Sequence, residues 1–387
     1  MNTQLNPNVT GQRFSVIRDM VSRAAAYDNV ISLSIGEPDF NTPAFVCKSA
    51  FNDALQGYTH YAPSKGDEEL KKALLPRLAG KYGIPFSMDE LLITSGAMHG
   101  LLAVMLTLLQ KDDEVICPAP CFSDYKGHCG IAGAKLVMVP TLFSRGFIPT
   151  RDDLEACLTP KSRVLLINSP CNPSGVVLPP ETLDMMAEFA IDHDLVVVSD
   201  EVYDRIAFGT APESIATRPG MAERTVILNS FSKFYAMTGW RVGYAAGPQW
   251  IMQEMVKVLS YSMASTNTAG QRAALSALTG PQDEFLGFVE AYRKRTALAW
   301  KRLSVMPGVQ CLRPRGTFYL FPHIDAAEED SFRFAVDLLD KEQVVVVPGF
   351  PFGPDETVRG CIRLACTVDE DKISEAMDRL ERYLSRR

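Results

Sequence analysis

The feature that most constrains the fold of this 387-residue chain is a repeated alternation of short apolar runs with helical patterns. Short runs rich in β-branched residues predict buried strands, and a helix between two strands implies a crossover connection and parallel pairing. We therefore expect an α/β fold with a mostly parallel, helix-flanked sheet. The runs are Leu91–Thr94, Glu114–Cys117, Lys135–Val139, Arg163–Asn168, Leu195–Ser199, Thr225–Asn229 and Val242–Ala246.

One connection in this series is too short for a crossover helix. Only the stretch Lys233–Arg241 separates Asn229 from the run that begins at Val242. Antiparallel strands can be joined by such a short connection, whereas parallel strands cannot. We expect one antiparallel strand in the sheet.

The alternation of strands and helices changes its pattern after about residue 285. A long charged helix pattern, Asp283–Leu303, precedes a shorter α/β region that ends in the amphipathic helix Glu370–Leu384. A chain of this length exceeds one ordinary core. We predict a large domain over residues 46–285, which would bind the ligand discussed below, and a small α/β domain formed by residues 1–45 and 286–387 at the two chain ends.

Composition and charge narrow the function classes. The net charge of -7 gives no basic surface for nucleic acid, and no apolar stretch is long enough to predict a membrane span. The first seven residues lack the pattern of a secretory signal. The nine cysteines form no paired Cys-x-x-Cys units, which predicts free thiols and no metal site. We expect a soluble cytoplasmic enzyme of small molecules.

Polar residues follow four of the predicted strands. In a parallel sheet, ligands bind where the carboxyl ends of the strands meet. Each group alone has an ordinary explanation, since Asn-Pro-x-Gly is a common turn, an Asp or a Ser-Gly-Ala is often a helix cap, and a lone lysine is usually solvated. Their convergence on one edge favours a single ligand that uses them all. The segments are 95–98, 169–175, 200–203 and 230–233.

Pyridoxal 5'-phosphate has the chemistry that this set of residues would bind. A lysine amine forms a Schiff base with its aldehyde, and neighbouring cations help to lower the pKa of that amine. A carboxylate keeps the pyridine nitrogen protonated, which makes the ring an electron sink. A helix N-terminus, hydroxyl groups and an arginine would bind the phosphate.

The segment from Ser230 to Tyr244, which reads Ser-Phe-Ser-Lys-Phe-Tyr-Ala-Met-Thr-Gly-Trp-Arg-Val-Gly-Tyr, resembles the lysine signature of a known family. That family is the class I/II aminotransferases of fold type I, in the aspartate aminotransferase superfamily. The similarity runs from about Ile31 to the C-terminus. It implies that Lys233 forms the Schiff base and that Ser230, Ser232 and Arg241 contact the phosphate.

Other positions resemble the family motifs one at a time. By that likeness Asp200 pairs with the pyridine nitrogen, while Tyr203 and Asn172 contact the ring oxygen. The loop Gly96-Ala97-Met98 would bind the phosphate, and Phe122 would stack on the ring. Lys233, Asp200 and Tyr203 are the residues to which the resemblance assigns the catalytic chemistry.

The same resemblance extends to the substrate and to a second subunit. Gly36 and Asn172 would contact the substrate, and Arg363 would bind its α-carboxylate through two hydrogen bonds. Tyr61 matches a tyrosine that reaches the phosphate of the neighbouring subunit. This implies a homodimer with two shared active sites.

Two departures from the family pattern bear on specificity. Met98 lies where a branch of aspartate-using relatives has a lysine, and no arginine occurs in Tyr261–Met263 to reach a partner. We therefore expect a neutral donor, and 2-oxoglutarate as acceptor only if Arg272 or another arginine reaches the pocket.

Cys171 replaces the Asn or His of many relatives, and we interpret it as a small packing residue. The candidate wall residues are Phe14, Ile17, Ile35, Met98 and Phe122. For Phe14 and Ile17 the alternative is one face of a packed N-terminal helix.

Three hypotheses remain from the residues alone. The first is a transaminase that moves an amino group from an L-amino acid to a 2-oxo acid in a ping-pong cycle. The second is a carbon–sulfur lyase or an aminocyclopropane-carboxylate-synthase-like enzyme with the same cofactor. The third is a regulator with an aminotransferase-like domain, which is not expected because only about 30 residues precede the first family motif. The Ser-Ile-Gly-Glu-Pro-Asp-Phe and Gly-Trp-Arg motifs favour the transaminase.

Overall fold

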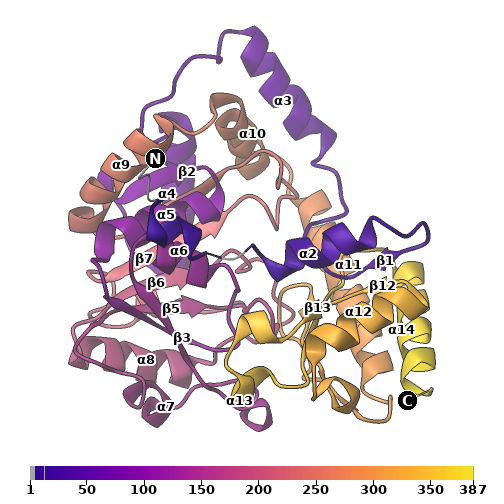
Figure 1. The fold of residues 1–387 in the computed structure, drawn as a ribbon. Helices are drawn as coiled ribbons and strands as arrows, with labels where there is room; N and C mark the ends of the chain where they lie inside the picture. Colours follow the sequence, from indigo (N-terminus) through magenta and orange to yellow (C-terminus); the bar gives the residue numbers. More distant parts are fainter. Residues whose placement is uncertain (1–4, 13, 387) are drawn as a thin grey trace.

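The computed structural model describes residues 5–12 and 14–386, and its centre is a seven-stranded sheet with the order β2-β8-β7-β6-β5-β3-β4 (Figure 1). The strand pairs from β7 to β4 are all parallel, and β8 is antiparallel to both β7 and β2. The predicted mostly parallel sheet with one antiparallel strand is confirmed. The strands are β2 (Leu91–Thr94), β3 (Glu114–Pro118), β4 (Lys135–Val139), β5 (Ser162–Asn168), β6 (Val196–Asp200), β7 (Thr225–Ser230) and β8 (Gly243–Ala246).

The polar segments predicted to form the site follow β2, β5, β6 and β7. The antiparallel strand β8 lies between β2 and β7, so these four strands are not all neighbours in the sheet. Because β2 is antiparallel to β8, it runs in the same direction as β7 and ends at the same edge. Gly243 pairs with both Thr94 and Ser230 at that edge. A Cβ atom on Gly243 would lie 2.7 Å from the carbonyl oxygen of Asn229 and 2.8 Å from the amide nitrogen of Ala97. Only glycine permits this close approach of the two strand ends.

Helices cover both faces of the sheet because its central strands are apolar on both sides. Leu166 and Val198 pack with α5 and α9, whereas their chain neighbours Leu165 and Val197 pack with α8 on the opposite face. Helices α4 and α10 pack against the β2, β7 and β8 side of the sheet. The helices are α3 (Ala44–Leu55), α4 (Glu68–Tyr82), α5 (Gly96–Leu108), α6 (Tyr125–Ile131), α7 (Arg151–Glu155), α8 (Pro180–Asp192), α9 (Gln249–Met263) and α10 (Thr268–Thr279).

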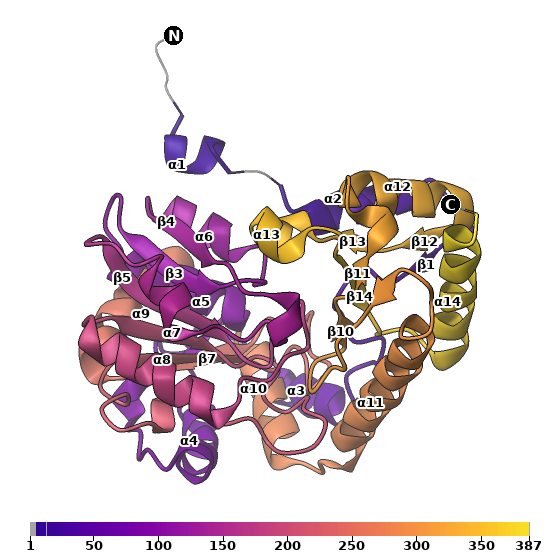
Figure 2. The same ribbon diagram turned by 90° about the horizontal axis from the view of Figure 1, so that it is seen from below.

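A second core joins the two ends of the chain, as both views show (Figure 1 and Figure 2). Strand β1 (Ile31–Ser32) pairs in parallel with β12 (Val344–Val345), and Met20 of α2 (Val16–Ala24) packs in the same core. Strand β14 (Ile362–Ala365) is antiparallel to β10 (Tyr319–Leu320) and to β13 (Val347–Pro348). The other elements are α1 (Pro7–Thr10), α11 (Asp283–Leu303), β9 (Val309–Gln310), β11 (His323–Ile324), α12 (Ser331–Glu342), α13 (Asp355–Val358) and α14 (Glu370–Leu384).

Helix α11 belongs to both cores. Phe285, Phe288 and Tyr292 at its beginning pack with the large core, and Ala299 and Leu303 near its end pack with the second core. The division at residues 45 and 285 therefore stays a prediction.

Among the described residues, no helix combines the length and the apolar character needed to cross a membrane.

Candidate active site

A cavity of about 530 Å³ opens at the carboxyl edge of the sheet, between the two cores. Twelve of the predicted catalytic, cofactor-binding and substrate-binding residues line it, and they come from strand ends, from the start of α5, from the segment before α3 and from β14. Gly96 and Tyr61 are not among its lining residues. The lining residues from that set are Gly36, Ala97, Met98, Phe122, Asn172, Asp200, Tyr203, Ser230, Ser232, Lys233, Arg241 and Arg363.

Lys233 lies in the loop that follows β7 and extends its amine into the cavity. Its Nζ donates to the carbonyl oxygen of Gly36 at 2.6 Å. Burial lowers the pKa of Lys233 to about 8, and the guanidinium groups of Arg363 and Arg241 act in the same direction. An amine with this pKa is partly neutral near pH 7, so it can act as a nucleophile and as a base.

Asp200, at the end of β6, is the carboxylate inside the cavity. Burial raises its pKa to about 6, although hydrogen bonds from the Tyr125 hydroxyl at 2.6 Å and from the Val202 amide at 3.2 Å oppose that rise. A cation beside Asp200 would restore its ionised form. The sequence analysis missed Tyr125, which lies in the same short segment as Phe122 and meets its ring edge to face at 5.5 Å.

Arg363 is almost completely buried, with 1% of its surface exposed. Its Nη1 donates to Oδ1 of Asn172 at 3.0 Å, its Nη2 donates to the carbonyl oxygen of Ser34, and its Nε has no partner among the described residues. A buried guanidinium that meets no carboxylate is costly unless a ligand supplies the negative charge. This geometry fits a receptor for a substrate carboxylate.

Tyr319 connects the arginine to the phenol of Tyr203, and the sequence analysis missed it as well. The guanidinium of Arg363 lies 4.6 Å from the centre of the Tyr319 ring, and the two hydroxyl groups of Tyr319 and Tyr203 lie 3.1 Å apart. A Cβ atom on Gly36 would lie 1.5 Å from the Tyr319 hydroxyl. Glycine at position 36 is therefore required for this tyrosine to reach the cavity.

The phosphate-binding residues predicted from the sequence come together between β7 and the start of α5. The hydroxyl of Ser230 donates to that of Ser232 at 2.8 Å, and Arg241 donates through Nη2 to the carbonyl oxygen of Ser95 at 3.4 Å. Gly96 has a φ of +74°, and a Cβ atom there would lie 2.5 Å from Nη2 of Arg241. The cradle formed by two hydroxyls, a guanidinium and the first turn of a helix fits a phosphate dianion.

The predicted wall residues are only partly correct. Ile17, Ile35, Met98 and Phe122 line the cavity. Phe14 does not, and 94% of its surface is exposed, because it precedes α2 and points away from both cores. The sequence pattern could not define the direction of a side chain outside the helix.

Arg272 cannot reach the cavity. Its guanidinium is paired with Asp53 at 2.6 Å and with Glu69 at 2.8 Å, and it is not among the lining residues. Arg18 of α2 lines the cavity instead, together with Ile17 and Val21 on the same helix face. The sequence analysis missed Arg18 because only the packing of α2 on the second core places it there.

Cys171 is packed against the segment before Phe122. Its thiol donates to the carbonyl oxygen of Pro120 at 3.3 Å, and burial raises its pKa to about 11. A thiol with this pKa carries almost no thiolate near pH 7 and is unreactive. This supports the interpretation of Cys171 as a packing residue.

One group of described residues outside the cavity could offer metal ligands. Atoms of His323, Asp325 and Glu328 lie within 4.8 Å of one another, at the beginning of the second core's short strands. Nε2 of His323 already lies 3.2 Å from a Glu328 oxygen, and both carboxylates are exposed. Exposed acidic groups of this kind are common on protein surfaces that bind no metal ion.

Comparisons with known proteins agree with this geometry. A family model described as aminotransferase class I and II matches residues 28–380. The chain is 38% identical to aromatic-amino-acid aminotransferase 2 of Thermococcus litoralis, over 96% of this chain and 95% of that one. It is 39% identical to an aspartate aminotransferase of Pyrococcus abyssi, with coverage of 96% and 95%. The structure of the Thermus thermophilus aspartate aminotransferase with maleate superposes with a TM-score of 0.92, at 34% identity, over 98% of this chain and 99% of that one.

Proposed function

Since this chain belongs to the class I and II aminotransferases, we propose that Lys233 carries its cofactor and that neutral L-amino acids are its preferred donors. The protein is a pyridoxal-5'-phosphate-dependent transaminase that acts on amino acids and 2-oxo acids. The comparisons do not favour the carbon–sulfur lyase or the aminocyclopropane-carboxylate-synthase-like alternative.

The observation that carries the proposal is the position of Lys233. Its amine, with a pKa lowered to about 8, lies in one cavity with a carboxylate at a strand end and a buried arginine. When bound, the cofactor supplies an electron-accepting ring for the electron pair of the substrate Cα–H bond. The residues present fit that group, because the cradle at Gly96 admits a phosphate and Asp200 can face a ring nitrogen.

The roles of the surrounding residues follow from their chemistry. Lys233, partly neutral near pH 7, would take the proton from the substrate Cα and hold it for return. Asp200, held by Tyr125, would keep a proton on the ring nitrogen. Asn172 and Tyr203 would bind the ring oxygen, and the side chain of Phe122 would cover the ring and exclude water. The phosphate would be bound by Ser230, Ser232, Arg241 and the loop Gly96-Ala97-Met98.

The substrate is oriented by the opposite side of the cavity. Arg363 binds the α-carboxylate, and its free Nε is the donor that completes a two-point contact. Gly36 and Asn172 contact the same end of the substrate. The reacting Cα then lies within reach of Lys233, because the carbonyl oxygen of Gly36 accepts a hydrogen bond from the Lys233 amine at 2.6 Å.

A preference for neutral donors is supported by the walls on the side of the substrate side chain. These walls include the apolar side chains of Ile17, Ile35 and Met98, although Arg18 and Glu37 also line the cavity. Burying an apolar side chain there is favourable by about 25 cal/mol per Å². A donor series tests the proposal: kcat/KM for alanine, methionine and phenylalanine should exceed that for aspartate with one fixed 2-oxo acid.

The reaction type is tested in the same assay. A transaminase converts the bound cofactor to its amino form and releases a 2-oxo acid without ammonia. A lyase releases ammonia and leaves the cofactor unchanged. Release of ammonia with every donor, or a preference for aspartate over all neutral donors, would contradict the respective part of the proposal.

We further propose a homodimer with shared active sites in the cytoplasm. Tyr61, in the segment after α3, is 88% exposed, and Tyr261 of α9 is 94% exposed. Exposed aromatic side chains of this kind could be covered by a partner chain. The nine free cysteines suit a reducing compartment. Mixing inactive Tyr61→Ala chains with inactive Lys233→Ala chains should restore activity in mixed dimers. An active species of monomer mass would contradict the dimer.

A further inference from the structure

A second cavity, of about 880 Å³, lies behind the loop that carries Lys233. We call it the rear cavity. Phe231 and Phe234, which flank Lys233 along the chain, form part of its floor, and it shares only Ser230 with the catalytic cavity. Lys233, Asp200 and Arg363 do not line it, so none of the catalytic roles described above accounts for it.

Two arginines face the rear cavity without a carboxylate partner among the described residues. Arg205 donates to the Tyr235 hydroxyl at 2.7 Å and to Gln282 at 3.4 Å, and its guanidinium lies 3.5 Å from the centre of the Phe234 ring. Arg77 donates to the carbonyl oxygen of Leu278. Both guanidinium groups act on one phenol, since burial raises the pKa of Tyr235 while Arg205 and Arg77 oppose that rise. Both guanidinium groups therefore lie near the Tyr235 phenol.

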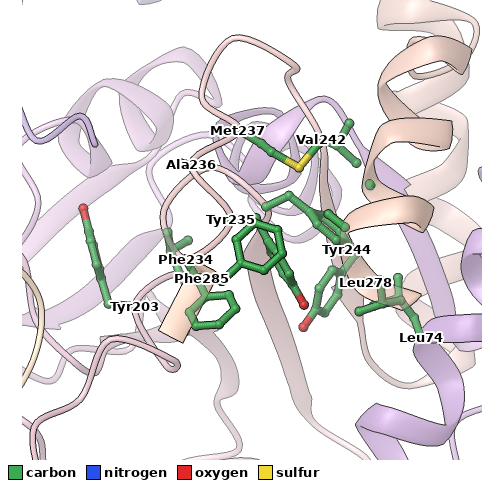
Figure 3. Close-up of a cluster of buried hydrophobic side chains, with 14 of the residues drawn as sticks. Leu74, Tyr203, Phe234, Tyr235, Ala236, Met237, Val242, Tyr244, Leu278 and Phe285 are labelled. Atoms are coloured by element: carbon green, nitrogen blue, oxygen red, sulfur yellow. The ribbon is translucent and has the colours of Figure 1, made fainter. Parts of the chain in front are cut away.

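Tyr244 adds a hydroxyl group at the same place. Its side chain lines the rear cavity with only 9% of its surface exposed, and its hydroxyl makes no hydrogen bond to another described residue. Figure 3 shows the hydroxyl groups of Tyr235 and Tyr244 close together at the end of the aromatic cluster. The Tyr244 hydroxyl is therefore available to donate to a ligand oxygen in the cavity.

The carboxylates around the rear cavity are engaged by other cations. Lys81 lies 3.0 Å from Glu201 and 2.5 Å from Asp204, and Glu213 lies 2.7 Å from Arg218. The hydroxyl of Tyr82 also donates to Glu201, at 2.9 Å. None of these carboxylates forms an ion pair with Arg77 or Arg205, so these two guanidinium groups are the cations that could bind an anion.

The rear cavity also has an apolar lining. Besides Phe231 and Phe234, this lining includes Leu74, Leu78, Leu278 and Leu286. Phosphate or sulfate alone would leave these side chains without contact, whereas an apolar group attached to an acid would cover them. The ligand that matches both features is an acid with an aliphatic or aromatic body.

We propose that the rear cavity is a second small-molecule site, which binds a monocarboxylate with an apolar body. The carboxylate accepts hydrogen bonds from Arg77, Arg205 and the Tyr244 hydroxyl, and the apolar body packs against the leucines. This site goes beyond the transaminase reaction and involves no bond making or breaking.

Calorimetry on the holoenzyme with 3-phenylpropionate tests this site. Pretreatment with aminooxyacetate, which reacts with the cofactor, removes the catalytic cavity as a competing site. One site per chain should then remain, and 3-phenylpropanol, which lacks the charge, should bind at least about tenfold more weakly. Absence of any site in the pretreated wild type would overturn the proposal.

Variants locate the site. Tyr244→Phe removes only the unpaired hydroxyl, and Arg205→Gln or Arg77→Gln removes one charge, so affinity should fall by about tenfold in each. Arg293→Gln is the matched control, because Arg293 pairs with Glu290 on the surface of α11 and lies outside the rear cavity. Wild-type affinity in both Tyr244→Phe and Arg77→Gln would contradict the assignment, even if Arg205→Gln failed to fold.

Discussion

The two halves of the catalytic cavity are built in different ways. The cofactor half consists of residues at the ends of β5, β6 and β7 and at the start of α5, which one continuous sheet places side by side. The substrate half is assembled from segments far apart in sequence: α2, the segment around Gly36, and β14, whose Arg363 donates to Ser34. On the proposed roles, the chemistry would therefore depend on the sheet, and the choice of substrate would depend on how the second core packs against it.

This difference predicts two kinds of variants. A change in the cofactor half should lower activity with every donor by the same factor. A change in the substrate half should alter the ratio between donors or acceptors and leave the best pair largely intact. The predictions below use that contrast, beginning with the largest effect.

Lys233→Ala should abolish transamination with all donors. The variant loses both the covalent attachment of the cofactor and the base at Cα, for which we expect a loss of at least about 10⁴-fold in kcat. Single-turnover assays with three donors measure it. Lys257→Ala is the control, since Lys257 is a surface lysine that pairs with Glu254 at 2.7 Å. If the loss of kcat differed strongly between donors, the assignment of Lys233 to the cofactor half would be contradicted.

Asp200→Asn should lower kcat by about 10²- to 10³-fold, again with every donor alike. The amide cannot keep a proton on the ring nitrogen, so removal of the Cα proton becomes slower. The primary deuterium isotope effect on Cα–H cleavage should rise in parallel. Wild-type turnover in this variant would mean that Asp200 only caps the loop after β6.

Arg18→Met should change acceptor preference, and it is the test of the substrate half. Arg18 is the lining cation for which we assign no other role, so the distal carboxylate of 2-oxoglutarate is its expected partner. We expect kcat/KM for 2-oxoglutarate to fall by roughly tenfold and kcat/KM for pyruvate to stay within twofold, since exposed charge pairs are weak. Equal losses with both acceptors would show that Arg18 only supports the packing of α2.

Tyr125→Phe should also have a small effect, no more than about tenfold on kcat, and it should shift a pH dependence. The Tyr125 hydrogen bond opposes the burial that raises the Asp200 pKa to about 6, so its loss raises that pKa further. Asp200 must be ionised to pair with a protonated ring, and cofactor affinity therefore falls as the pH falls through this pKa. In Tyr125→Phe that fall should occur at higher pH, as measured by cofactor titration of the apoenzyme. An unchanged midpoint would make Tyr125 a packing residue.

The contrast between the halves also explains what the sequence could predict. The order of apolar runs placed Asn172, Asp200 and Lys233 at one edge, because strand ends in a parallel sheet meet there whatever the loops do. Even β8 followed from the short connection after Lys233. The start of α5 was predicted too, because the segment 95–98 follows the run that ends at Thr94, and the helix begins at Gly96.

No local sequence pattern indicates the residues that only tertiary packing brings to the cavity or to its lining side chains. Tyr125 and Tyr319 enter from α6 and β10, and only distances of 2.6 Å to Asp200 and 3.1 Å to Tyr203 reveal their roles. Arg18 and Arg272 are both isolated arginines in the sequence. Arg272 is held by Asp53 from a segment 219 residues away, and no local pattern indicates that pairing.

The most direct test of the account is the identity of the residue that carries the cofactor. The holoenzyme is reduced with borohydride, digested, and analysed by mass spectrometry for a peptide with an added pyridoxyl group. We predict a single adduct on Lys233, with a stoichiometry of one per chain, and none in Lys233→Ala. An adduct on any other lysine would contradict the assignment of the catalytic cavity.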